Sequence, residues 1–267
     1  MLRRTLNNAL RVFGQEITSV KWLQAYQEEL KFYQRLSPSL LLYSQLPQEA
    51  KELISPYLPY SKAQLAQDLF ALAIAGTTAP KFFVEFGATD GVDLSNTWLL
   101  EKKLGWNGIL AEPAIIWHDA LKSNRSCAIE TKCVARESNQ KFQFLEVTSH
   151  PELSGIEEFA DTGDRHSSFR LANSQRFEVD TISLDDLLDT HNAPGDIQFL
   201  SIDTEGSEFD ILEVFDFSRR KIRSISVEHN YVVPRRQSIH ALLIKHGYKQ
   251  VFERISKFDD WYVLDLD

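Results

Sequence analysis

The feature that most constrains the fold is an apolar run ending in a glycine-rich turn, Phe82-Phe83-Val84-Glu85-Phe86-Gly87-Ala88-Thr89-Asp90-Gly91. Apolar runs of this length that end in glycine are typical of buried strands in a parallel sheet. Residues 92–104, which come next, have the apolar spacing of a helix. The stretch therefore predicts a strand, a tight turn and a helix. In an open α/β sheet, such a turn lies where ligands bind.

The rest of the chain continues this alternation. Strands are expected near 81–86, 108–112, 127–134, 197–203 and 222–228, and helices near 92–104, 114–122, 206–215 and 236–246. The alternation predicts an α/β fold of right-handed βαβ units with a mostly parallel sheet. Residues 248–256 and 261–266 also have the pattern of strands, and no helix separates them. This last pair must therefore be antiparallel.

Three further segments complete the expected organisation of residues 61–267. A helix is expected over 61–75, with Ser61 as its N-cap and Gly76 at its end. Additional strands are expected at 142–147 and 177–182, and Ser183 to Asp186 resembles a capping box. The long polar segment 148–176, which includes His166, predicts a functional lid, because compact domains seldom contain connections of that length.

Residues 1–60 have a different pattern. Apolar side chains recur at helical spacing from Ile17 to Tyr33, and prolines then interrupt the segment. We expect short helices and turns that form an N-terminal helical extension. Such an extension would pack on the domain 61–267 or join two subunits as a homo-oligomer.

Composition limits the possible partners and compartment. A net charge of −9 argues against nucleic acid as the main partner. The sequence has no apolar run of membrane-spanning length and no recognisable signal peptide. Cys127 and Cys133 are too few for a disulfide framework, so we expect buried strand residues in a reducing cytoplasm.

Acids at the strand ends indicate a class of ligand. Glu85 lies within an apolar strand, where an unpaired carboxylate is costly. The second strand ends in Glu112-Pro113, which places an acid where it could accept hydrogen bonds from a ribose. The turn lacks the GxGxxG pattern of dinucleotide sites, and Asp90 would repel a diphosphate. S-adenosylmethionine, with its ribose, ammonium and sulfonium groups, suits these residues, but an ordinary turn with a capping aspartate explains Asp90 equally well.

A second group of polar residues follows two later strands. One strand ends in Asp203-Thr204-Glu205-Gly206 and the next in Glu228-His229-Asn230. In one interpretation, Asp203 and Glu228 position a substrate and His229 is a general base. In another, Asp203, Glu228 and Asn230 bind Mg²⁺ or another divalent cation through oxygen. In a third, these residues only cap helices and hold loops.

Four motifs in order resemble the FkbM-type methyltransferase family. They are Glu85-Phe-Gly-Ala-Thr-Asp-Gly91, Leu110-Ala-Glu-Pro113, Thr181-Ile-Ser-Leu-Asp-Asp186 and Ile202-Asp-Thr-Glu-Gly-Ser-Glu208. The resemblance runs from about Ser61 to the C-terminus. It implies a class I, S-adenosylmethionine-dependent enzyme with a Rossmann-like sheet. It also implies O-methylation of a hydroxyl on a sugar, glycan or natural product.

The resemblance further implies roles for individual residues. The turn would hold the methionine part of the cofactor, through Glu85, Gly87, Ala88, Asp90 and Gly91. Glu112 with Pro113 would hold the ribose, and Ser95 and Asn96, in the first turn of a helix, would reach the cofactor carboxylate. Asp203 would face the methyl group and the acceptor. Two alternatives stay open, an NAD(P)-dependent oxidoreductase and a non-catalytic interaction module.

Overall fold

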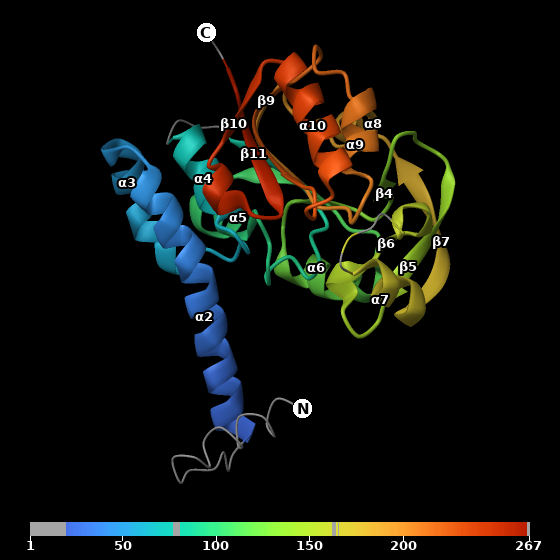
Figure 1. The fold of residues 1–267 in the computed structure, drawn as a ribbon, viewed down its shortest axis with the longest axis horizontal. Coiled ribbons are helices and arrows are strands. Elements are labelled where there is room, and N and C mark those ends of the chain that lie inside the picture. The colour runs from blue at the N-terminus through green and yellow to red at the C-terminus, as the bar shows by residue number, and fades with distance from the viewer. Residues whose placement is uncertain (1–19, 77–80, 162–163, 165, 266–267) are drawn as a thin grey trace.

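A seven-stranded sheet forms the centre of the protein in the computed structural model, which describes residues 20–76, 81–161, 164 and 166–265 (Figure 1). In spatial order, its strands are β10 (Tyr248–Val251), β11 (Asp259–Leu264), β9 (Lys221–Glu228), β8 (Asp196–Ile202), β1 (Phe82–Phe86), β2 (Asn107–Ala111) and β3 (Ala128–Glu130). Only β11 is antiparallel to its neighbours β9 and β10. The mostly parallel sheet and its antiparallel C-terminal pair are as predicted.

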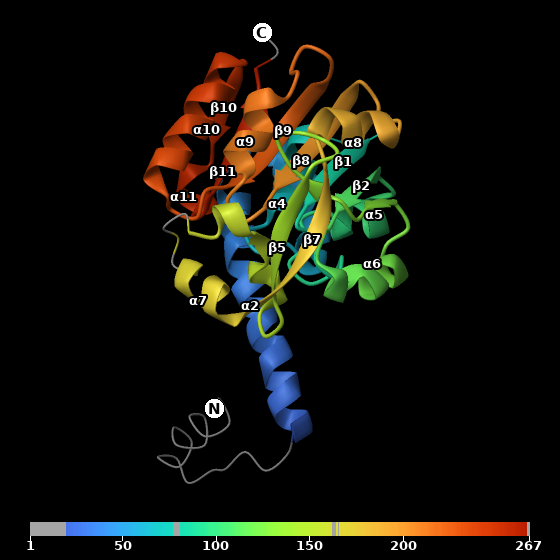
Figure 2. The same ribbon diagram turned by 90° about the vertical axis from the view of Figure 1, so that its right-hand side faces the viewer.

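Helices cover both faces of this sheet (Figures 1 and 2). One face packs against α8 (Leu184–Thr190), α9 (Glu208–Val214) and α10 (Val233–Lys245). The other packs against α4 (Gln67–Ala75), α5 (Trp98–Leu104) and α6 (His118–Asn124). Within β1, Val84 belongs to the first core and Phe83 to the second, because successive side chains of a strand point to opposite faces. Burial on both faces explains why the strands are almost continuously apolar.

A second sheet lies at one side of the first (Figure 1). Its order is β4 (Cys133–Val134), β7 (Ser174–Ile182), β5 (Lys141–Val147) and β6 (Gly155–Ile156). The single strand expected over 127–134 is therefore wrong, since β3 and β4 belong to different sheets. The strands expected at 142–147 and 177–182 are present as β5 and β7.

The segment 148–176 is folded into short elements rather than one long irregular connection. It contains η3 (Pro151–Leu153), β6, η4 (Glu157–Phe159) and α7 (Ser167–Asn173). Its own apolar contacts include Ile156, which packs with Phe144 of β5. Residues 162, 163 and 165 lie outside the described part of the chain. The role of this segment as a lid stays a prediction.

Three helices begin clearly later than the sequence pattern suggests, and one of them, α6, follows the 3-10 turn η2 (Ile115–Trp117). α4 starts at Gln67 instead of Ser61, because the Ser61 hydroxyl donates to Asp68 (2.7 Å) and Ala63 forms a β-bridge with Leu94. α5 starts at Trp98 instead of Val92, since residues 92–97 form a loop bound to Glu85. Gly76 ends α4 as expected.

The first C-terminal strand is shorter than predicted, and the second, β11, begins earlier, at Asp259. β10 stops at Val251, Phe252 adopts a positive φ of 55°, and the short helix α11 (Glu253–Ser256) follows. At the start of α8, the Ser183 hydroxyl accepts a hydrogen bond from the Asp186 N–H (3.2 Å), which confirms half of the expected capping box.

The N-terminal region consists of α2 (Val20–Gln45), α3 (Gln48–Ile54) and η1 (Ser55–Tyr60). Pro38 lies inside α2, so the expectation that this proline breaks the segment is wrong. The C-terminal end of α2 packs on the body through Leu42, next to Leu46 just after the helix, and the rest of α2 extends away from the body (Figures 1 and 2). The expected pairing of subunits through this region, and the domain boundary after residue 60, stay predictions. Ile17 lies outside the described residues.

Within the described ranges, no helix combines the length and the apolar character needed to cross a bilayer. Cys127 is half-buried and Cys133 is buried, and neither forms a disulfide. The reducing cytoplasm that they suggested stays a prediction.

Candidate functional site

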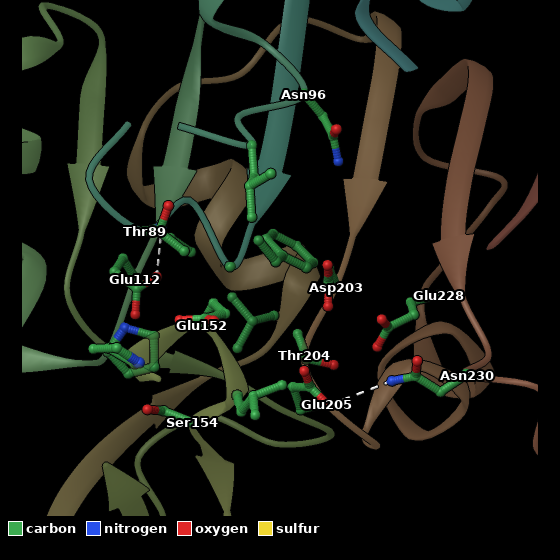
Figure 3. A pocket seen from close by; sticks show the side chains of 18 of the residues that line it. Thr89, Asn96, Glu112, Glu152, Ser154, Asp203, Thr204, Glu205, Glu228 and Asn230 are labelled. Atoms are coloured by element: carbon green, nitrogen blue, oxygen red, sulfur yellow. Dashed lines mark hydrogen bonds between the residues drawn. The ribbon is translucent and has the colours of Figure 1, made fainter. Parts of the chain in front are cut away.

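One cavity opens at the carboxyl ends of β1, β2, β8 and β9 (Figure 3). Its empty volume, open mouth included, is about 1150 Å³. The second sheet and η3 form an apolar wall that includes Val134, Phe144 and Leu153. Gln64 and Gln67, which precede and begin α4, close another side. The strand ends supply most of the polar groups, as expected for a parallel sheet.

Glu112 comes directly after β2 and lies on the cavity wall with an exposed fraction of 4%. One carboxylate oxygen accepts the Thr89 N–H (2.8 Å) and the other accepts the Ala114 N–H (2.8 Å). Burial raises the pKa of this carboxyl to about 7, despite these two hydrogen bonds. Since a carboxylate oxygen can accept two hydrogen bonds, each oxygen keeps capacity for a ligand hydroxyl.

Three acids at the ends of β8 and β9 converge on one space (Figure 3). One oxygen each from Asp203, Glu205 and Glu228 lies within 4.8 Å of the other two. Burial raises the pKa of Asp203 and of Glu228, and the neighbouring carboxylates raise both further. The Glu228 Oε2 atom is buried and has no hydrogen-bond partner among the described residues. We call these three residues the acid cluster.

Glu205 is tied to the second sheet region through Arg170, whose side chain is fully buried in α7. The guanidinium forms ion pairs with Glu205 and with Asp164, and it donates to the Leu153 carbonyl (2.6 Å). Burial raises the pKa of Glu205 to about 7, although Arg170 opposes this shift. Arg170 therefore links Leu153 and Asp164 directly to the acid cluster.

Asn230, expected as a metal ligand, contributes its amide nitrogen to this region. Its Nδ2 donates to Glu205 Oε2 (3.4 Å), as Figure 3 shows. The third carboxyl beside Asp203 and Glu228 belongs to Glu205, which lies in a predicted motif but was not among the predicted site residues.

Glu85 does not line the cavity. Its carboxylate accepts hydrogen bonds from the Asn96 N–H (2.6 Å) and the Ser95 hydroxyl (3.0 Å), and also from the Thr97 hydroxyl. Arg125 forms a buried ion pair with it at 3.8 Å. Burial raises the pKa of Glu85, and Arg125 opposes the rise. We call these residues the Glu85 cradle, which holds the loop before α5.

The glycines of the turn are required by packing inside the protein. A Cβ at Gly87, whose φ is +73°, would collide with the Asp203 carbonyl oxygen. A Cβ at Gly91 would lie 2.6 Å from Arg125 Cγ. Gly87 borders the cavity, but Ala88 and Gly91 do not. Asp90 also faces the loop, because its carboxylate accepts the N–H groups of residues 92 and 93.

Ser95 and Asn96 differ in what they offer to a ligand. The Ser95 hydroxyl is used within the cradle, where it accepts from Arg125 (3.1 Å). Asn96 lines the cavity and donates through Nδ2 to Ser201 (2.9 Å), whereas its buried Oδ1 has no partner among the described residues. Neither residue lies in a helix, so the expected interaction with a helix N-terminus does not apply.

His229, expected as a general base, faces away from the cavity. It is 1% exposed, and its two ring nitrogens lie 3.1 Å from the Asp259 carbonyl oxygen and 3.0 Å from the Tyr231 N–H. The backbone after β9 thus directs Glu228 into the cavity and His229 into the core. Pro113 does border the cavity, next to Glu112.

Several lining residues could not be identified from the sequence. Phe144, Leu153 and Cys133 come from the second sheet region, whose position over the strand ends depends on long-range packing.

Comparison with known proteins identifies the chain's family. The family model described as "Methyltransferase FkbM domain" matches residues 85–255. A search among curated proteins finds no match to the sequence. The matched region contains the end of β1 and all of β2, β8 and β9, whose carboxyl ends form the cavity. This chain belongs to the FkbM methyltransferase family.

Proposed function

We propose that this protein is an S-adenosylmethionine-dependent O-methyltransferase that acts on a hydroxyl of a sugar, glycan or natural product. Family membership supports methyl transfer, and the α/β sheet is compatible with a Rossmann-like methyltransferase fold. The observation that carries the proposal is the position of Glu112 and the acid cluster on opposite parts of one cavity (Figure 3).

The residues present fit the cofactor. S-adenosylmethionine, when bound, supplies a methyl group already activated on a positively charged sulfur. Glu112 would accept hydrogen bonds from the ribose, with Pro113 beside it. The unpartnered Oδ1 of Asn96 would accept from the ammonium group. Glu85, Ser95 and Gly91 would act only by positioning, since their contacts hold the loop that carries Asn96.

The acceptor would lie against the acid cluster. Asp203 and Glu228 would orient its hydroxyl, because both border the cavity and converge there. The five carboxyls on the wall are Glu112, Glu152, Asp203, Glu205 and Glu228, and none of the described lining residues is Lys or Arg. An acceptor that carries a phosphate or sulfate is therefore disfavoured, and a neutral or cationic acceptor is favoured.

The same charge distribution disfavours the oxidoreductase alternative. An NAD(P) diphosphate would meet carboxylates without a cation from the described wall to balance it. The family match also argues against this alternative. The non-catalytic alternative differs in a simpler way, because a pure scaffold has no need to bind the cofactor.

Two measurements on the full chain test the proposal. Calorimetry should detect binding of S-adenosylmethionine and no binding of NAD⁺ or NADP⁺. Incubation with methyl-labelled cofactor should then transfer label to sugars or glycans with free hydroxyls, and not to matched compounds in which those hydroxyls are blocked. Absence of cofactor binding would contradict the proposed function, and label on nitrogen alone would contradict O-methylation.

A further inference from the structure

The acid cluster and its surroundings contain more carboxyl groups than cations that could pair with them. Two further buried acids, Glu208 and Asp259, lie close enough to Asp203 and Glu228 to interact with them electrostatically. Two arginines oppose this charge. Arg170 is shared between Glu205 and Asp164, and Arg235 lies 3.5 Å from Glu208. Within the described residues, neither arginine forms an ion pair with Asp203 or Glu228, so these two carboxyls face each other without an ion-pair partner.

Glu228 supplies an independent sign of a missing ligand. The residue is 94% buried, and its Oε2 atom has no hydrogen-bond partner among the described residues. Leaving a carboxylate oxygen buried without a partner is costly. Its side chain points into the same space as Asp203 and Glu205 (Figure 3). A bound cation would satisfy this atom.

We infer that Asp203, Glu205 and Glu228 bind one divalent cation through carboxylate oxygen, as Mg²⁺, Mn²⁺ or Ca²⁺ requires. One carboxylate oxygen of each residue lies within 4.8 Å of those of the other two, which suits a cation of this size. Two ligands on opposite sides of Mg²⁺ lie about 4.2 Å apart, and on opposite sides of Ca²⁺ about 5 Å apart. The donor set contains neither Cys nor His, so a zinc site of the usual type is disfavoured.

The ion gives the cluster a role in the proposed function, on which this part of the inference rests. Because all three acids line the cavity, an ion held by them would be accessible from it, and an acceptor oxygen could become a further ligand. A hydroxyl bound to a divalent cation has a lower pKa, so it loses its proton more readily. His229 is then not needed as a base, which agrees with its position in the core.

Mn²⁺ titration of the full chain, followed by electron paramagnetic resonance of the free ion, tests the site directly. We expect one bound ion per chain with a Kd at or below about 1 mM. Asp203→Asn and Glu228→Gln should each raise the Kd at least about tenfold, because each removes a charged ligand. Glu152→Gln is the matched control, since this exposed acid lines the same cavity outside the cluster, and it should bind as the wild type does.

Two results would overturn the site. One is no binding up to about 10 mM Mn²⁺. The other is equal binding by the wild type and both cluster variants, which would place the ion elsewhere. Using two variants keeps the test valid if one fails to fold, as circular dichroism would show. Calorimetry with S-adenosylmethionine on the same samples separates this inference from the proposed function, because either can fail while the other holds.

Discussion

The Glu85 cradle and the acid cluster are two buried carboxylate sites at the ends of neighbouring strands, and they differ in how their oxygens are satisfied. Glu85 has three hydrogen-bond donors from residues 95–97 and the buried cation Arg125. Glu228 has an oxygen with no partner within the described structure, and its nearest charged neighbours are other acids. In the sequence, Glu85 lies within an apolar run, whereas Asp203 and Glu228 each end one.

The difference shows that burial of an acid at a strand end does not by itself identify a ligand site. A carboxylate whose hydrogen-bonding capacity is filled by the protein is part of the framework, because a ligand would have to displace those partners. A carboxylate left short of partners is costly to the fold, and function is one reason to retain it. By this criterion the cradle is structural and the acid cluster is available to a ligand.

The largest effect that separates the two sites is expected for Arg125→Ala. Arg125 has a fully buried side chain and bonds to Glu101, Gly91 and Thr97 as well as Glu85. Removing one partner of a buried ion pair leaves the other charge uncompensated, so the free energy of unfolding should fall by about 3–5 kcal/mol. Urea unfolding measures this loss.

The control variant is Arg223→Ala, which removes a partly exposed ion pair with Asp196. Its free energy of unfolding should fall by less than about 1 kcal/mol. If the free energy of unfolding fell by similar amounts in the two variants, the Glu85 cradle would contribute no more to stability than a surface ion pair.

The opposite pattern is expected for Asp203→Asn. Removing one negative charge from the crowded acid cluster relieves repulsion, so the free energy of unfolding in the presence of chelator should be unchanged or higher. Methyl transfer should fall at least about 100-fold, because the acceptor loses a group that positions it. Urea unfolding gives the free energy of unfolding, and the labelled-methyl assay gives the rate of methyl transfer. A clear loss of stability together with normal turnover would place Asp203 with Glu85 among the framework residues.

Glu112 is the intermediate case, and Glu112→Gln should give the smallest of the three effects. Each of its oxygens has one backbone partner and room for a second. Loss of a charged hydrogen-bond acceptor should raise the Kd for S-adenosylmethionine about tenfold. The ionised carboxylate is the better acceptor and attracts the cationic cofactor. Affinity of the wild type should therefore weaken as the pH falls through about 7, where Glu112 becomes protonated.

Calorimetry across this pH range checks the expectation for Glu112. The Gln variant cannot titrate, so its affinity should lose the part of the pH dependence that Glu112 contributes. Glu152→Gln serves as the control and should keep the wild-type profile. If the Gln and wild-type profiles coincide, Glu112 does not contact the cofactor.

Local sequence patterns predicted most of the main sheet but misplaced several boundaries. The strand, turn and helix around residues 82–104 were recognised, yet the helix begins only at Trp98 because the Glu85 cradle holds residues 92–97 in a loop. Pro38 lies within α2 although prolines usually interrupt helices. The second sheet was predicted as isolated strands, since nothing local indicates that residues 133–134 pair with 181–182.

The sequence by itself determined the α/β class, the order of the strands along the chain and the placement of acids at strand ends. These follow from the periodicity of apolar residues, which depends on neighbours within a few positions. Only the tertiary structure decided which acids face the cavity. Glu85 meets Arg125 from forty positions later, and His229 turns toward Asp259, whereas Glu205 joins Asp203 and Glu228. Burial and hydrogen-bond partners arise from contacts between distant parts of the chain, and local patterns do not contain that information.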